Sequence, residues 1–138
     1  DRSIFKIVDL DEAWAFLNVA QGETLSNKLV RAGRAMNAGV YFVTQSATDV
    51  SKESLKNNIG LKFAFRSTAI EEIKQTLEFF GLDKEDENNQ KRLRDLENGQ
   101  CLFQDLRGRV GVIQVHPAFE ELLTAFDTRP PISRNEVE

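Results

Sequence analysis

Two acidic side chains stand side by side after an apolar stretch near the start of this 138-residue chain. The stretch includes Ile7 and Val8, and the acidic residues are Asp11 and Glu12. Such an apolar run is typical of a strand buried on both faces of a parallel sheet. Sheets of this type place their ligand sites outside the carboxyl ends of the strands. The pair is therefore a candidate for chemistry, although Asp11 could instead be the N-cap of the following helix.

Adjacent carboxylates at the end of a buried strand have a use in nucleotide hydrolysis. Asp11 could hold the shell of a magnesium ion, and Glu12 could polarise the attacking water. A second apolar segment, residues 40–45, ends at Gln45, whose amide could contact a terminal phosphate or orient the water. The alternative is that Gln45 caps the next turn, but Gln is a poor N-cap compared with Ser, Thr, Asp or Asn.

The positions of these residues depend on an alternation of strands and helices. We expect strands near residues 4–8, 40–45 and 61–66, separated by helices at 11–17, 23–37 and 51–57. Residues 100–115 predict a hairpin with its turn near residues 105–108. The alternation predicts an α/β fold with a mostly parallel sheet flanked by helices and a C-terminal antiparallel hairpin.

The helices differ in the faces that we expect them to bury. In the helix at 23–37, the apolar side chains of Leu25, Leu29, Ala32 and Met36 recur on one face. An amphipathic helix should span residues 70–80, and the charged segment 83–98 predicts an exposed helix anchored by two leucines. A final helix should bury the apolar side chains Phe119, Leu122, Leu123 and Phe126. Residues 128–138 are rich in proline and polar residues and predict a loose tail.

Composition excludes several classes of protein. The net charge of −4, with both signs interspersed, argues against holding nucleic acid by bulk electrostatics. No apolar run approaches the ~20 residues of a membrane span. Cys101 is the only cysteine and His116 the only histidine, so neither a disulfide within the chain nor a Cys/His zinc site can form. A reducing, cytoplasmic setting fits best.

Three segments of the chain together resemble a known family. They are IVDLDEAW at residues 7–14, LVRAGRAMNAGVYFVTQSATDV at 29–50 and LKFAFRST at 61–68. They look like the last part of a VirB4-type conjugation ATPase, a motor of type IV secretion related to the FtsK and HerA DNA pumps. The resemblance implies a RecA-like P-loop NTPase fold. Residues 1–127 would be the C-terminal half of the motor domain, from Walker B onward.

The resemblance assigns roles to the strand-end residues. Asp11 and Glu12 match the Walker B pair, with Asp11 toward the metal and Glu12 as the catalytic base. Gln45 matches the glutamine that senses the γ-phosphate. The implied cofactors of the full-length parent are ATP and Mg²⁺.

Three arginines are further candidates. Arg31 and Arg34 fall where the family places an arginine finger that reaches the nucleotide of a neighbouring subunit. We favour Arg34, because it lies on the helix side opposite the apolar residues of that helix. A solvated arginine on an exposed face is the alternative for either one. Arg66 ends the third strand and could approach phosphate, or it could simply close an exposed strand end.

The same residues also allow a competing interpretation, in which the chain belongs to a superfamily 2 RNA helicase. The stretch DEAW at residues 11–14, followed by SAT at 46–48, imitates two helicase motifs. The fourth position of the first motif should be acidic or His, and here it is Trp14. We therefore interpret the helicase match as coincidental.

The sequence lacks the glycine-rich G-x-x-x-x-G-K-[ST] loop that cradles phosphates in P-loop hydrolases. In the family this loop lies well upstream of Walker B, so we interpret the chain as a fragment of an ATP-hydrolysing motor that is inactive alone. The alternative is a complete, non-enzymatic interaction module that kept the fold and lost the loop.

The resemblance also implies partners and a location. The parent would assemble as a hexamer and the fragment as a monomer or dimer. Other secretion-system components would be partners, and DNA is a candidate partner. The protein would be cytoplasmic and peripheral at the inner face of the bacterial membrane. Within the fragment, we expect residues 40–44 to pair in parallel with residues 61–66, or two copies to join at these strand edges.

Overall fold

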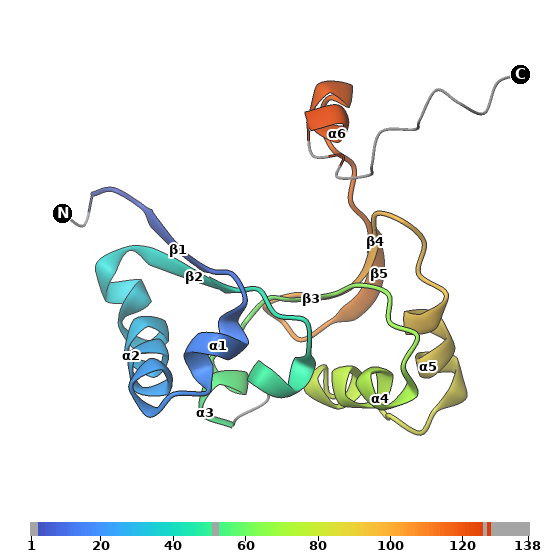
Figure 1. The fold of residues 1–138 in the computed structure, drawn as a ribbon, viewed down its shortest axis with the longest axis horizontal. Helices are drawn as coiled ribbons and strands as arrows, with labels where there is room; N and C mark the ends of the chain where they lie inside the picture. Colours follow the sequence, from blue (N-terminus) through green and yellow to red (C-terminus); the bar gives the residue numbers. More distant parts are fainter. Residues whose placement is uncertain (1–2, 51–52, 126, 128–138) are drawn as a thin grey trace, which may run out of the picture.

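The computed structural model of the chain describes residues 3–50, 53–125 and 127. The side chains of Glu23, Arg34, Glu53 and Ser54 are outside this description. Figure 1 shows an α/β arrangement in which helices α1 to α5 lie along one side of the strands. The final helix, α6, stands apart beyond the strands of the hairpin.

The strands form two separate sheets. Strands β1 (Lys6–Leu10) and β2 (Ala38–Phe42) form a parallel pair. Strands β3 (Lys62–Ala64), β4 (Gln100–Gln104) and β5 (Val110–Gln114) form an antiparallel sheet in that order. The predicted C-terminal hairpin is confirmed as β4–β5, and the N–H of Asp105 donates to the carbonyl of Arg109 at its turn (3.0 Å).

The predicted parallel sheet is only partly present. Residues 62–64 pair in antiparallel register with β4, and not with the second strand as we expected. The prediction that residues 40–44 lie beside residues 61–66 is therefore wrong. Strand β4, the first strand of the hairpin, satisfies the ladder hydrogen bonds on one edge of β3, and the other edge of β3 pairs with none of the described strands. Edge pairing between two copies stays a prediction.

Helices occupy the segments between the strands. The bounds are α1 Ala13–Leu17, α2 Ala20–Met36, α3 Glu53–Lys56, α4 Ile70–Phe79, α5 Glu87–Arg94 and α6 Glu120–Ala125, with a 3-10 turn, η1, at Ala47–Val50. Among the described residues, no helix is both long enough and apolar enough to cross a lipid bilayer. The predicted final helix exists, but the prediction that it buries its apolar side chains is wrong, because Phe119, Leu122 and Leu123 are exposed. Phe126 and the predicted tail, residues 128–138, lie outside the described residues.

One apolar cluster lies between the strands and helices α1 to α5. Its buried members come from both halves of the chain: Ala13, Leu17, Val50, Leu55, Ile73, Leu77, Phe79, Phe80, Leu93, Leu96 and Leu102. The inward side chains Leu10, Phe42 and Ala64 pack against this cluster from both sheets. The described helices therefore bury one face of each sheet.

The opposite face of the strands is exposed. Burial along β1 alternates, with Ile7 61% exposed while Leu10 packs against the core. Tyr41 on β2 and Phe63 on β3 are also about half exposed. The expectation of a first strand buried on both faces is wrong, because helices α1 to α5 of the described chain lie along one side of the strands (Figure 1).

Helix α2 packs only in part through its predicted apolar face, on which Leu29 and Ala32 are half-buried. Leu25 and Met36, predicted to face the core, are about half exposed, whereas Gly22, Ser26 and Gly33 are buried. A Cβ atom added at Gly22 would stand 1.9 Å from the backbone oxygen of Phe16. Close backbone approach therefore decides which face of this helix packs, and a residue without a side chain permits it.

We predict that Gly22→Ala destabilises the chain by about 1–3 kcal/mol, as overpacked sites do. This reverses the usual sign, since Ala in place of Gly in a helix ordinarily stabilises. Gly111→Ala is the matched control, because an added Cβ there meets nothing within 4 Å. Urea unfolding measures the free energy of unfolding of both variants. A Gly22→Ala variant as stable as the unsubstituted chain would contradict the close approach.

Candidate functional site

The two predicted strand-end groups meet in the structure. The parallel register sets Leu10 beside Phe42, and the chain continues from these residues to Glu12 and Gln45. The amide Nε2 of Gln45 donates to Oε1 of Glu12 at 2.9 Å, across 33 residues of sequence. Both side chains are exposed at this edge of the sheet.

Backbone hydrogen bonds continue the pairing beyond the two strands. The N–H of Val43 donates to the carbonyl of Leu10 at 3.0 Å, and the N–H of Ala13 donates to the carbonyl of Val43 at 2.9 Å. The start of α1 is thereby attached to the segment that follows β2. The separation of Glu12 from Gln45 is fixed by main-chain contacts on both sides.

Glu12 has a left-handed backbone conformation, with φ 51° and ψ 46°. Such values are uncommon for residues other than Gly and often occur at functional sites. Its N–H donates to Oδ1 of Asp11 at 2.9 Å. Glu12, and not Asp11, occupies the N-cap position of α1, so the alternative in which Asp11 caps this helix is wrong. Asp11 instead supports the turn that presents Glu12.

A second donor holds the same carboxylate. The indole Nε1 of Trp14 donates to Oε2 of Glu12 at 2.6 Å. Each carboxylate oxygen of Glu12 thus accepts one neutral donor, and each keeps a further lone-pair site for another proton. The carboxylate is therefore oriented without being saturated. Trp14 was not among the predicted site residues, and its position two residues after Glu12 was the available signal.

The loop after β2 is attached at several points. The hydroxyl of Thr44 donates to Oδ2 of Asp49, within the same loop. The hydroxyl of Ser46 donates to Oε2 of Glu72 at 2.9 Å, and the N–H of Ala47 donates to Oε1 of Glu72, also at 2.9 Å. Glu72 lies in the first turn of α4 and was not a sequence candidate, because nothing local in the sequence indicates a contact 26 residues away.

The candidate arginines lie elsewhere. Arg31 and Arg34 are in α2, whose Met36 end leads into the start of β2, at the edge opposite Glu12. The Nζ of Lys6, at the start of β1, donates to the carbonyl of Met36 at 3.2 Å. Fourteen residues of helix separate Arg34 from Ala20, which is about 20 Å of rise. Arg31 is exposed, and the side chain of Arg34 lies outside the described residues.

Arg66 follows β3 and is exposed. Among the contacts of the described residues, none joins Arg31 or Arg66 to Asp11, Glu12 or Gln45. The structure therefore brings together two of the predicted site residues, with Asp11 beside them, and places the arginines outside this group.

The other side chains with reactive or charged groups make no contact with the strand-end group among the described residues. Cys101 is fully buried in β4, and burial raises the pKa of its thiol, in agreement with a packing role. Arg109 forms an ion pair with Asp105 at 2.6 Å across the hairpin turn. The hydrogen bonds from Arg109 hold the pKa of Asp105 below its usual value. His116 is exposed.

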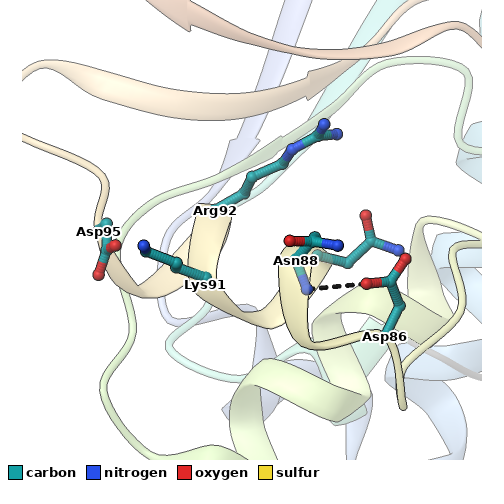
Figure 2. A pocket seen from close by; sticks show the side chains of 6 residues that line it. Asp86, Asn88, Lys91, Arg92 and Asp95 are labelled. Carbon is teal, nitrogen blue, oxygen red and sulfur yellow. Dashed lines mark hydrogen bonds between the residues drawn. The ribbon is translucent and has the colours of Figure 1, made fainter.

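A hollow on the surface of α5 is lined by polar and charged residues, and Figure 2 shows it from close by. Its lining residues are Asp86, Asn88, Asn89, Lys91, Arg92 and Asp95. Oδ1 of Asp86 accepts the N–H of Asn88 at 2.7 Å, which caps the helix. The helix predicted for residues 83–98 is confirmed in part, because α5 spans Glu87–Arg94, with Leu93 buried on it and Leu96 buried just after it. Its mixed charges lie away from the strand-end group.

The described residues supply only part of a magnesium site. Within the described part of the chain, no three His, Cys, Asp or Glu side chains converge as a metal site. Mg²⁺ in nucleotide sites usually keeps several waters and takes one or two carboxylates together with the phosphates of the substrate. Asp11, exposed beside Glu12, fits such a partial role and no larger one.

Comparisons with known proteins cover most of the chain. The sequence profile of a family described as AAA-like domain matches residues 1–126. The chain is also similar to Uncharacterized protein YddE of Bacillus subtilis (strain 168), with 34% identity over 119 residues. The aligned region is 86% of this chain and 14% of the relative. The chain therefore spans a small part of the length of that relative.

We predict that the indole N–H of Trp14 reports directly on Glu12. Trp14 is the only tryptophan, so the indole region of a ¹H–¹⁵N spectrum contains a single resonance. Glu12→Ala should move this resonance upfield, because the carboxylate acceptor is lost. Glu71→Ala, an exposed change on α4, is the control and should leave the resonance in place. A resonance that ignores Glu12→Ala would contradict the hydrogen bond.

Proposed function

The chain belongs to the AAA-like domain family, and on that premise we propose that it is the C-terminal half of an ATP-hydrolysing motor domain. Membership implies a P-loop ATPase-type function in general. The finer proposal is that the full-length protein powers conjugative DNA transfer or type IV secretion, as the resemblance to VirB4-type ATPases implies. The family match also favours the pump interpretation of residues 11–14 over the helicase interpretation.

The hydrogen bond between Gln45 and Glu12 carries this proposal. A general base must be held in hydrogen-bond reach of the attacking water, with a defined orientation. Gln45 and Trp14 orient the carboxylate of Glu12, and Gln45 keeps a second amide N–H that can donate to a phosphate oxygen and an amide oxygen that can accept from a water. Glu12 is the proposed base, and Gln45 the proposed γ-phosphate sensor.

Asp11 would contribute to Mg²⁺ binding once the phosphates of ATP are present. The bound ion would supply charge neutralisation of the β- and γ-phosphate oxygens. The side chain of Asp11 also supports the backbone turn at Glu12, so it would link the metal shell to the base. The phosphate cradle itself would come from a glycine-rich loop outside these residues, since the sequence has no G-x-x-x-x-G-K-[ST] motif.

The exposed strand face supports a role as part of a larger domain. The apolar side chains of Ile7, Tyr41 and Phe63 are exposed on the strands, and Phe65, directly after β3, is exposed as well. Apolar side chains exposed along a sheet face are candidates for cover by another element. We propose that a further part of the motor domain, which would include the phosphate-binding loop, packs there.

The arginine finger is proposed to act between subunits. Arg31 and Arg34 lie in the half of α2 that is remote from Glu12, so neither is placed for the nucleotide of its own subunit. In a hexamer, this half of α2 would have to face the neighbouring subunit. Other secretion components and DNA are further proposed partners. Peripheral attachment to the inner face of the bacterial membrane is the proposed location. All three rest on the resemblance.

The proposal predicts that Glu12→Gln in the full-length protein abolishes ATP hydrolysis while nucleotide binding persists. The amide keeps the shape of the side chain but cannot accept a proton as the carboxylate does. We expect a loss of turnover of about 10²-fold or more, since general-base catalysis typically contributes 10²–10⁴-fold. Steady-state phosphate release and binding of a fluorescent ATP analogue measure the two properties.

Two outcomes would contradict the proposal. A Glu12→Gln protein that hydrolyses ATP at the unsubstituted rate would exclude Glu12 as the base. A full-length protein that neither binds nor hydrolyses ATP would favour the interaction-module alternative. The 138-residue chain alone is the control, and it should show no measurable turnover, because it lacks the phosphate-binding loop.

A further inference from the structure

Glu72 of α4 holds the loop that carries Gln45 in a two-point contact. Its Oε2 accepts the hydroxyl of Ser46 and its Oε1 accepts the N–H of Ala47, both at 2.9 Å. Both bonds are partly buried. Hydrogen bonds to a carboxylate are about twice as strong as those between neutral groups, so this contact holds the loop strongly.

Ser46 and Ala47, the two residues that Glu72 contacts, directly follow Gln45. The hydroxyls of Ser46 and Thr48 lie 2.7 Å apart, and the N–H of Ala47 is the first of the η1 turn. The carboxylate of Glu72 therefore satisfies a donor that opens a helical turn, as an N-cap side chain would, although it comes from a different helix. The contact fixes the backbone at the position next to the sensor side chain.

Helix α4 is itself immobilised in the core. Ile73, adjacent to Glu72, and Leu77, one turn further, are both fully buried. Glu72 therefore projects from a rigid element onto a loop, which is the arrangement that positions a functional side chain reliably.

From these contacts we infer that Glu72 is a positioning residue for Gln45. It sets the loop after β2 so that the Gln45 amide reaches Glu12, and it connects the position of α4 to the geometry of the strand-end group. This inference rests on the proposed function, in which Glu12 is the base and Gln45 the sensor. Glu72 touches neither Glu12 nor the substrate in this account, so its effect is exerted through the loop.

Substitutions at Glu72 separate geometry from charge. In Glu72→Ala, the N–H of Ala47 and the hydroxyl of Ser46 lose their acceptor. In Glu72→Gln, the side-chain oxygen can accept from the N–H of Ala47, and the amide can donate to the serine hydroxyl, which also accepts hydrogen bonds. Glu72→Gln is therefore the conservative variant that should rescue positioning. Glu71→Ala, its exposed neighbour in the same turn, is the matched control.

The test compares these variants in the full-length protein. We expect Glu72→Ala to lower kcat by about 10- to 100-fold with little change in KM, because small displacements of catalytic groups cost this much. Glu72→Gln and Glu71→Ala should retain most of the turnover. Hydrogen exchange followed by mass spectrometry should show faster exchange in peptides covering residues 44–50 for Glu72→Ala alone, with an unchanged unfolding temperature.

Several results would overturn the inference. Equal kcat in Glu72→Ala and Glu71→Ala would show that the contact does not matter for turnover. Equal losses in Glu72→Ala and Glu72→Gln would show that hydrogen-bond geometry is not the cause. Unchanged exchange in residues 44–50 would show that Glu72 does not hold the loop. Glu12→Gln is measured in the same series, and wild-type turnover in that variant would refute the proposed function itself and, with it, any positioning role in hydrolysis.

Discussion

The parallel ladder between β1 and β2 is the constraint on which the candidate site depends. Its register pairs Leu10 with Phe42 and continues through the hydrogen bond from Val43 to Leu10. Side chains alternate between the two faces of a strand, so a slip of one residue would turn each of them to the other face. Glu12 and Gln45 can meet only in the register that is observed, because each follows its strand by a fixed number of residues.

Successive contacts stabilise what the ladder brings together. The left-handed turn at Glu12 directs its carboxylate toward Gln45, and Trp14 holds the second oxygen of that carboxylate. The loop that carries Gln45 is in turn attached to α4 through Glu72. The resulting network links two strands and two helices through polar groups, and the apolar cluster beneath it fixes the helices. The exposed opposite face of the strands leaves room for a second layer of structure.

Sequence reasoning predicted the elements better than it predicted their packing. The apolar runs and the polar residues after them correctly indicated that Glu12 and Gln45 lie at one edge of a sheet. The pairing of β3 was wrong because local pattern does not distinguish two possible partners, and the hairpin strand β4 provided one in antiparallel register. The predicted burial of Leu25 and Met36 on α2 was wrong, because apolar periodicity does not indicate the close backbone approach at Gly22 and Gly33.

The residues that support the site were harder to predict than the site itself. Glu72 and Ala47 are 25 residues apart, and nothing in either local sequence indicates the contact. Trp14 was easier to find, since it stands two residues after Glu12 in the sequence. Its role depends, however, on the unusual backbone conformation of that glutamate. The arginines show the reverse case, because a role in another subunit depends on an assembly that one chain does not contain.

The most direct test of this account is a structure of the full-length protein with Mg²⁺ and a non-hydrolysable ATP analogue. The account predicts that the γ-phosphate lies beside Gln45, with one water between it and the carboxylate of Glu12, and that Asp11 faces the metal. Nucleotide bound elsewhere, with Glu12 and Gln45 remote from the phosphates, would contradict the claim that the ends of β1 and β2 form the hydrolytic site.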